Sequence, residues 1–275
     1  MITRRRFLTI MAAAPVLAAL YTWRMEPTWV EYVRRQLPIR ELPESLKGKL
    51  LVHLSDIHVG ARVDAEYLAG VFVAVTALQP DIVAYTGDFV TYEGPATLAQ
   101  LRRMAPQLPR GKLGTVAVLG NHDYGRGWKQ TAVADEVART LSGIGCVVLR
   151  NQMIQVAGLK IGGVEDLWSD RLQLDPLAGA LKSPALMLCH NPDACDLPGW
   201  DGYQGWILSG HTHGGQCRPP FLPAPFVPIS NRRYTAGAVE LGNGRSLYIS
   251  RGLGHLLRVR FNVRPEVTVF QLTQA

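Results

Sequence analysis

From Leu50 onward, short apolar runs rich in β-branched residues alternate with amphipathic stretches, and this alternation limits the chain to an α/β architecture. Three of the runs have the length and composition of buried strands, namely residues 50–55, 82–86 and 115–119. The stretches between them have the spacing of helices that pack one face on a sheet, namely residues 64–79, which Asp64 can cap, and residues 96–107. The order strand, helix, strand, helix, strand therefore predicts an α/β fold.

The remainder of the chain is richer in strands than in helices. Seven further runs have strand character, namely residues 146–149, 152–156, 159–164, 185–189, 205–208, 247–250 and 266–272. Two stacked mixed β-sheets flanked by helices accommodate this order, so we expect a sandwich of that kind. The proline-rich residues 218–228 are expected to form a loop, because proline cannot donate a hydrogen bond to a central strand ladder.

The amino terminus has the pattern of a targeting segment. Arg4 and Arg5 precede an uncharged, apolar run from Phe7 to Trp23, and this pattern resembles a twin-arginine export signal. We therefore expect export by the twin-arginine route to the periplasm or to the outer face of the cytoplasmic membrane. Whether the segment is cleaved as a signal or retained as an anchor is open at this point.

The chain is expected to have three parts: a signal or anchor over residues 1–25, a linker over residues 26–49 and one folded domain over residues 50–275. Residues 26–49 mix aromatic and basic side chains. That composition is consistent both with a segment at a membrane surface and with a linker that packs on the domain.

The distribution of charge argues against a nucleic-acid binder. The formal net charge is +7, but residues 1–50 carry nine Lys/Arg against four Asp/Glu, and the other 225 residues carry 20 against 18. Affinity for phosphate backbones needs basic residues in the folded body, which is nearly neutral here. The four cysteines have no CxxC spacing, so neither a zinc knuckle nor a disulfide framework is indicated.

Polar residues able to bind metal follow five of the predicted strands. They are Asp56 and His58, Asp88, Asn121 with His122 and Asp123, His190, and His211 with His213. In an α/β sheet, ligands bind where the carboxyl ends of the strands meet. Each block alone has an ordinary explanation as a cap or a turn. Among them, two Asp, one Asn and four His together supply the mixed oxygen and nitrogen ligands that two divalent ions need.

The ordered blocks Asp56-Ile57-His58, Gly87-Asp88, Gly120-Asn121-His122-Asp123, His190 and Gly210-His211-Thr212-His213 resemble the active-site signature of the calcineurin-like metallophosphoesterase superfamily. The resemblance runs from about Leu50 to the carboxyl terminus. Within the superfamily the chain is most similar to the exported bacterial phosphodiesterase branch. The segments that carry this likeness are Gly214-Gly215-Gln216, Ser250 to Gly254, Arg260 to Asn262 and Arg264 to Glu266.

The resemblance implies a role for each residue of the signature. Asp56, His58 and His213 would hold one metal ion, Asn121, His190 and His211 would hold a second, and Asp88 would bridge them. A hydroxide between the ions would attack phosphorus. His122 would donate a hydrogen bond or a proton to the leaving oxygen, and Asp123 would orient His122. The ions could be Mn, Fe, Zn or Ni, because mixed His and Asp ligands suit all four.

The expected activity is hydrolysis of phosphoester bonds, above all phosphodiesters. An alternative enzyme is a pyrophosphatase of a nucleotide-linked lipid precursor of the UDP-diacylglucosamine type. A metal-free, protein-binding scaffold is disfavoured because every ligand is present. The expected partners are a phosphoester substrate, which could be linked to a lipid or an envelope polymer, and a membrane surface that meets the amino-terminal segment. The oligomeric state is open.

Several other histidines, arginines and aromatic residues lie outside the motif blocks and do not need a catalytic role. His53 is expected to be packed in the core, and His255 could line the cleft. Arg62 and Arg251 could meet a substrate phosphate or be solvated. Three arginines, Arg258, Arg260 and Arg264, alternate with apolar residues as on the polar face of a strand. The loop around Phe221 and Phe226 could cover the cleft or pack down.

Overall fold

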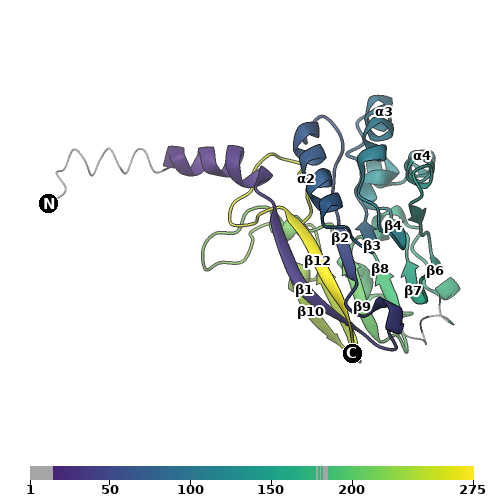
Figure 1. The fold of residues 1–275 in the computed structure, drawn as a ribbon. Helices are drawn as coiled ribbons and strands as arrows, with labels where there is room; N and C mark the ends of the chain where they lie inside the picture. Colours follow the sequence, from purple (N-terminus) through teal and green to yellow (C-terminus); the bar gives the residue numbers. More distant parts are fainter. Residues whose placement is uncertain (1–14, 178, 180, 182–184) are drawn as a thin grey trace.

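The computed structural model describes residues 15–177, 179, 181 and 185–275, and these form two six-stranded sheets stacked face to face (Figure 1). The first sheet has the order β1 (Glu31–Ile39), β12 (Glu266–Gln274), β2 (Leu50–Leu54), β3 (Ile82–Thr86), β4 (Gly114–Val118), β5 (Val147–Val148). The second has the order β10 (Gly237–Gly242), β11 (Arg245–Ile249), β9 (Gly205–Ser209), β8 (Leu186–Leu188), β7 (Leu159–Gly163), β6 (Gln152–Val156). Both sheets contain parallel and antiparallel pairs, which confirms the expected fold class.

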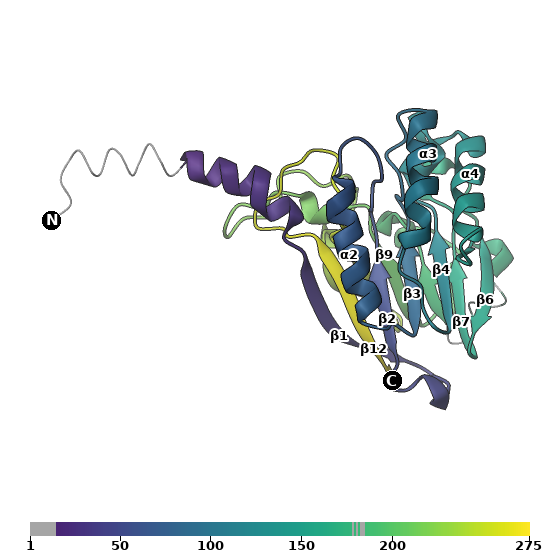
Figure 2. The same ribbon diagram turned by 45° about the horizontal axis from the view of Figure 1, so that its top comes forward.

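Three helices cover the outer face of the first sheet, namely α2 (Ala65–Ala77), α3 (Pro95–Met104) and α4 (Thr131–Ser142) (Figure 2). Residues 15–20 are helical and continue into η1 (Tyr21–Met25), which projects from the body. The remaining helical elements are short turns: η2 (Glu26–Thr28), η3 (Glu44–Leu46), η4 (Ala105–Gln107), η5 (Asn121–Tyr124), η6 (Arg126–Trp128), η7 (Leu167–Ser169), η8 (Asp175–Leu177), η10 (Pro192–Asp196), η11 (His213–Gly215) and η12 (Arg232–Tyr234).

Buried apolar side chains form three layers. One lies between the helices and the first sheet, for example Phe72 against Val83, and one lies between the two sheets, for example Leu51 and Leu208. The third covers the outer face of the second sheet with loop residues such as Trp200. These layers hold both sheets in place, so the loops at the ends of the strands are also held in fixed positions.

The residues expected to form a linker, 26–49, contain a strand that the sequence did not predict. Residues 31–39 form β1, which pairs in parallel with β12 over its whole length at the edge of the first sheet. Leu37 and Ile39 are buried, but the preceding residues are mostly exposed, so the segment lacks the apolar run of a central strand. An edge strand also tolerates Pro38, because its unpaired side needs no donor.

The sequence did not predict helix α4 or strand β10, and it gave the wrong structure for residues 258–264. The helix α4 buries Val133, Val137 and Leu141, but Gln130 before it provides no side-chain cap, so the usual start signal is absent. Strand β10 alternates between half-buried and exposed residues without a strong apolar face. The arginine-rich residues 258–264 form a loop rather than a polar strand face, and Arg260 is fully buried.

Candidate metal centre

The polar blocks meet at one edge of the sandwich, as predicted. Strands β2, β3 and β4 are parallel neighbours in one sheet, and β8 and β9 are parallel neighbours in the other, so their carboxyl ends point the same way within each sheet. The loops that follow them bring two separate groups of ligand atoms together: Asp56, His58 and His213, and Asp88, His190 and His211. All six side chains are buried.

The backbone at this edge is held in an uncommon conformation. Five of the candidate ligands have positive φ angles of 50° to 72°: Asp56, His58, Asp88, His211 and His213. Non-glycine residues adopt this region rarely, at a cost of about 1–3 kcal/mol each, and such residues cluster at functional sites. Gly87, with φ 87°, lies so close to the backbone of Gly120 that a Cβ atom would overlap it, so the loops after β3 and β4 touch only because both positions are glycine.

The first group has the geometry of a coordination shell. Nε2 of His58 lies 3.0 Å from Nε2 of His213, and Oδ1 of Asp56 lies 3.4 Å from the latter. Two ligands that bind one ion at ordinary metal–nitrogen distances are about 3.0–3.4 Å apart. Nδ1 of His58 hydrogen-bonds to Oγ1 of Thr91 at 2.9 Å, and this contact fixes the ring with Nε2 facing the group.

The second group is oriented in the same way. Nδ1 of His190 donates to the carbonyl of Thr86 at 2.6 Å, and Nε2 of His211 donates to the carbonyl of Pro228 at 3.0 Å. Because these nitrogens carry the protons, Nε2 of His190 and Nδ1 of His211, 3.2 Å apart, present lone pairs to the site.

Asp88 and Asn121 complete this arrangement. Oδ2 of Asp88 lies 3.2 Å from Nε2 of His190 and 3.6 Å from Nε2 of His58, so this carboxylate stands between the two groups. Oδ1 of Asn121 lies 3.2 Å from Nε2 of His190, while its buried Nδ2 has no partner among the described residues. The donor set therefore fits two divalent cations.

The electrostatics of the site also favour cations. Burial lowers the pKa of His58 and of His211 to about 3, so both imidazoles are neutral at neutral pH and their lone pairs are free for a metal ion. Burial also lowers the pKa of His190, but the carboxylates of Asp88, Asp56 and Asp166 together more than reverse this, and the net direction is upward. Burial raises the pKa of Asp56 to about 6. The upward shift of the His190 pKa shows that the carboxylates favour positive charge at this site, which is the charge that a metal ion would bring.

His122 and Asp123 have different surroundings. The half-buried His122 donates its backbone N–H to Oδ1 of Asp88 at 2.9 Å, and its ring centre lies 5.2 Å from that of His58. It therefore lies at the rim of the metal centre. The buried Asp123 instead accepts from the backbone N–H of Gly120 at 2.9 Å and of Val90 at 3.1 Å.

These bonds give Asp123 a structural role that the sequence did not predict. Its side chain turns back over the short η5 turn and joins the loops that follow β3 and β4, whereas the orienting contact with the His122 ring is not among its hydrogen bonds. Burial raises the pKa of this carboxyl to about 8.

Three residues near the metal centre were missed. Asp166 follows β7, is fully buried, and accepts from the backbone N–H of Trp168 with one oxygen, while the other has no partner among the described residues. Trp168 packs edge-on against His211 and stacks on Trp128, with ring centres 4.4 and 4.6 Å apart. The strand-end rule that singled out the other blocks also applies to Asp166, because it follows the predicted strand 159–164.

The remaining predicted residues have mainly structural contacts. His53 is buried and hydrogen-bonds to Oγ1 of Thr86 at 2.7 Å, which confirms its interpretation as a core histidine. His255 is buried and bonds to the carbonyl of Arg62. Arg251 forms ion pairs with Glu266 at 2.6 Å and with Glu31 at 3.0 Å, so it is not free to meet a phosphate.

Beside His122 lies an open cleft of about 570 Å³. Its walls include Arg62, Tyr92, Glu93, Arg126 and Trp128. Nε of Arg62 is paired with Glu93 at 2.9 Å. The cleft adjoins the metal centre and is large enough for a substituent of a phosphate group.

The chain is similar to several known proteins. Residues 50–215 match the family model described as calcineurin-like phosphoesterase. The chain is 32% identical to phosphodiesterase YaeI of Escherichia coli K12 over 99% of this chain and 100% of that protein. It is 30% identical to the uncharacterized metallophosphoesterase YkuE of Bacillus subtilis, over 98% and 97% of the two chains. It is 26% identical to the UDP-2,3-diacylglucosamine pyrophosphatase LpxG of Chlamydia trachomatis, over 96% and 95%.

Proposed function

Because this chain belongs to the calcineurin-like phosphoesterase family, we propose that it is an exported, metal-dependent enzyme that hydrolyses phosphodiesters. The observation that carries the proposal is the pair of buried ligand groups joined by Asp88, with ligand atoms at coordination spacing. The family itself makes the chain a hydrolase of phosphoester bonds.

Each ligand group would hold one divalent ion. Asp56, His58 and His213 would bind the first, Asn121, His190 and His211 would bind the second, and Asp88 would contact both. When bound, the ions supply Lewis-acid charge to the phosphate oxygens and lower the pKa of the attacking water. The hydrogen bonds to Thr91, Thr86 and Pro228 keep the imidazoles in the required tautomers.

The other residues of the site would handle the leaving group and the solvent. His122, at the rim beside His58, would hold the proton that the leaving oxygen requires. Asp123 would keep His122 in place indirectly, because it fastens the two loops that meet there. The stacked pair Trp128 and Trp168 would exclude water from the face of His211.

Two features favour a diester over a monoester. A diester carries a second substituent, and the cleft beside His122 offers it room. The relative YaeI is named a phosphodiesterase. A pyrophosphatase is the second candidate, because LpxG is similar over nearly its whole length and because Arg62 and Arg126 line the cleft where a second phosphate would lie. The complete ligand set argues against a metal-free scaffold.

The proposed location rests on the sequence. The arginine pair and the start of the apolar run precede residue 15 and lie outside the described residues. No helix among the described residues is both long and apolar enough to cross a bilayer. We propose export by the twin-arginine route, with the enzyme acting at the outer face of the cytoplasmic membrane on a phosphoester carried by a lipid or an envelope polymer.

A matrix of metals and substrates tests the proposed reaction. Metal-stripped protein is reloaded with Mn, Fe, Zn or Ni and assayed on bis-p-nitrophenyl phosphate, p-nitrophenyl phosphate and a nucleoside diphosphate ester. We expect the diester to give the highest kcat/KM, and Asp88→Asn to be inactive on all three. Faster cleavage of the nucleoside diphosphate ester would replace the proposal with the pyrophosphatase.

A further inference from the structure

Exposed apolar side chains gather at one end of the molecule. Among the described residues, sixteen large hydrophobic side chains are exposed, and eleven of them lie in three segments, residues 15–29, 216–233 and 254–264. The eleven are Val16, Leu17, Leu20, Trp23, Met25, Trp29, Phe221, Leu222, Phe226, Leu257 and Val259. Phe221 has no contact that shields it from solvent. Such a concentration marks an interaction surface rather than scattered surface residues.

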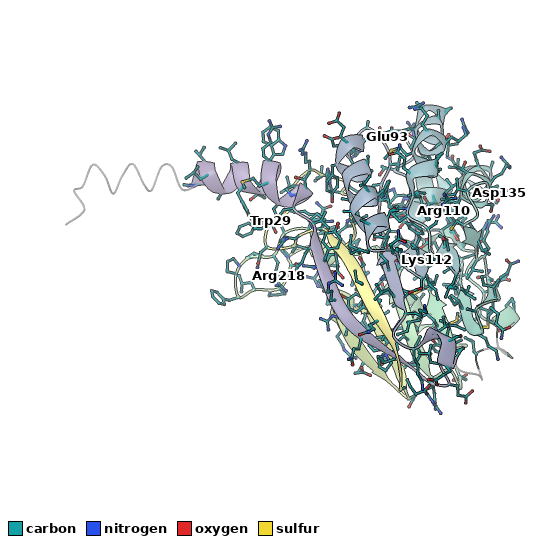
Figure 3. The ribbon with its side chains drawn as sticks, viewed as in Figure 1. Trp29, Glu93, Arg110, Lys112, Asp135 and Arg218 are labelled. Atoms are coloured by element: carbon teal, nitrogen blue, oxygen red, sulfur yellow. The ribbon has the colours of Figure 1, made fainter. Side chains whose placement is uncertain are left out.

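The three segments form one continuous surface, which we call the apolar end. The backbone N–H of Arg260 donates to the carbonyl of Thr22 at 3.0 Å, and that of Arg218 donates to the carbonyl of Phe261 at 2.8 Å. Nε2 of Gln216 donates to the carbonyl of Val259 at 2.9 Å. Figures 1 and 2 show the projecting helix with these two loops beside its base, and Figure 3 shows Trp29 and Arg218 together there.

The charge of the apolar end is uniformly positive. Its three segments carry seven arginines, of which only Arg260 is buried; the other six are Arg24, Arg218, Arg232, Arg233, Arg258 and Arg264. The one acidic residue, Glu26, is fully buried and accepts from the backbone N–H of Val263. Apolar tips surrounded by arginines match the acyl chains and anionic headgroups of a lipid leaflet. A second copy of this chain would bring like charges together, which disfavours a dimer through this surface.

We propose that the apolar end docks on an anionic bilayer through all three segments, so that loops of the folded domain insert together with the amino-terminal helix. This proposal rests on the proposed function, because docking matters for catalysis only if it brings the metal centre to lipid-borne phosphoesters. It goes beyond an amino-terminal anchor, since residues 216–233 and 254–264 belong to the folded domain.

The docking loops are connected directly to the metal centre. Residues 216–228 begin just after His213 and end at Pro228, whose carbonyl accepts the hydrogen bond from Nε2 of His211. Gly215, just before the segment, lies so close to Ala224 within it that a Cβ atom on Gly215 would overlap Ala224. The loop therefore joins the apolar end to the loop that carries two of the candidate ligands, His211 and His213.

Hydrogen exchange of the full chain tests which segments dock. Exchange is followed by mass spectrometry with vesicles of phosphatidylglycerol and phosphatidylcholine, and with vesicles of phosphatidylcholine alone. We expect slower exchange in residues 216–228 and 254–262, as well as in residues 15–25, with the anionic vesicles, and a weaker effect with the neutral ones. Protection confined to residues 15–25, or equal protection by both vesicles, would overturn the proposal.

A matched pair of variants gives an independent test. In the full chain, Phe221→Asp with Phe226→Asp should weaken binding to the anionic vesicles about tenfold or more, because two exposed apolar rings are lost. The control Val73→Asp, on the exposed face of α2, removes a side chain that is as exposed as Phe226 but lies elsewhere, and it should bind as the wild type does. Equal vesicle binding by all three proteins refutes docking by the loops. Absence of diester hydrolysis in the wild type would instead refute the proposed function.

Discussion

Replacement of Arg260 by methionine probes the interior of the loop behind the metal centre. The guanidinium is fully buried and donates to four backbone carbonyls, those of Val263 at 3.1 Å, Arg251 at 2.9 Å, Gly252 at 3.2 Å and Gly254 at 2.8 Å. Burial lowers its pKa to about 10, so the side chain is still charged at neutral pH. A methionine has similar length but no donor, and it would leave these carbonyls without their partner.

The expected cost follows from these contacts. Each buried acceptor left without a donor destabilises the fold by about 1–3 kcal/mol. Removal of the buried charge offsets part of this loss, because a buried guanidinium is itself costly to desolvate. We therefore expect the free energy of unfolding of Arg260→Met to fall by about 3 kcal/mol. The metal centre should suffer as well, because the loop that Arg260 supports donates from Leu253 to the carbonyl of Ser55 and from Gly254 to the carbonyl of Asp56.

Urea denaturation of the metal-loaded protein measures the change. Arg103→Met is the control, because Arg103 is exposed on α3 and its loss should change the free energy by less than about 0.5 kcal/mol. If the free energy of unfolding of Arg260→Met falls by less than about 1 kcal/mol, the reasoning is refuted, because the four carbonyls would then not depend on the guanidinium for their stability.

Three further predictions concern catalysis and export. His122→Ala should keep its metal content and lose rate most on diesters with poor leaving groups; equal losses across a series of leaving-group pKa values would remove His122 from proton transfer. Asp123→Asn should destabilise the fold by about 1–2 kcal/mol and slow all substrates alike, because it loosens a loop junction; a loss that follows leaving-group pKa would mean that it acts through His122. Arg4→Lys with Arg5→Lys should retain the protein inside the cell without changing its purified activity, and normal export would refute the targeting prediction.

The sequence was most informative where strands end. Asp56, Asp88 and His190 each follow an apolar run, and parallel strands bring such positions to one edge whatever the details of packing. Asp166 obeys the same rule, but no histidine stands beside it, so the sequence alone does not single it out.

The features that the sequence did not predict have a different cause. Their structure depends on contacts with residues that are distant in the sequence. Strand β1 has no apolar run of its own and is a strand because β12 is beside it. Arg260 alternates with apolar neighbours as a surface residue would, yet it is buried, and its guanidinium donates to backbone carbonyls of the surrounding loop. The hydrogen bonds of Asp123 depend on how the β3 and β4 loops meet, which no local pattern encodes.

Metal analysis combined with activity tests the central claim most directly. The wild-type protein is purified with its metals, and its metal content per chain and its hydrolysis of a chromogenic diester are measured beside His58→Ala and His190→Ala, one variant for each ligand group. The account predicts two divalent ions per chain in the wild type, a reduced content in each variant, and activity that falls with the loss of either ion. Full diester hydrolysis by metal-free protein, or by a variant that has lost an ion, would contradict it.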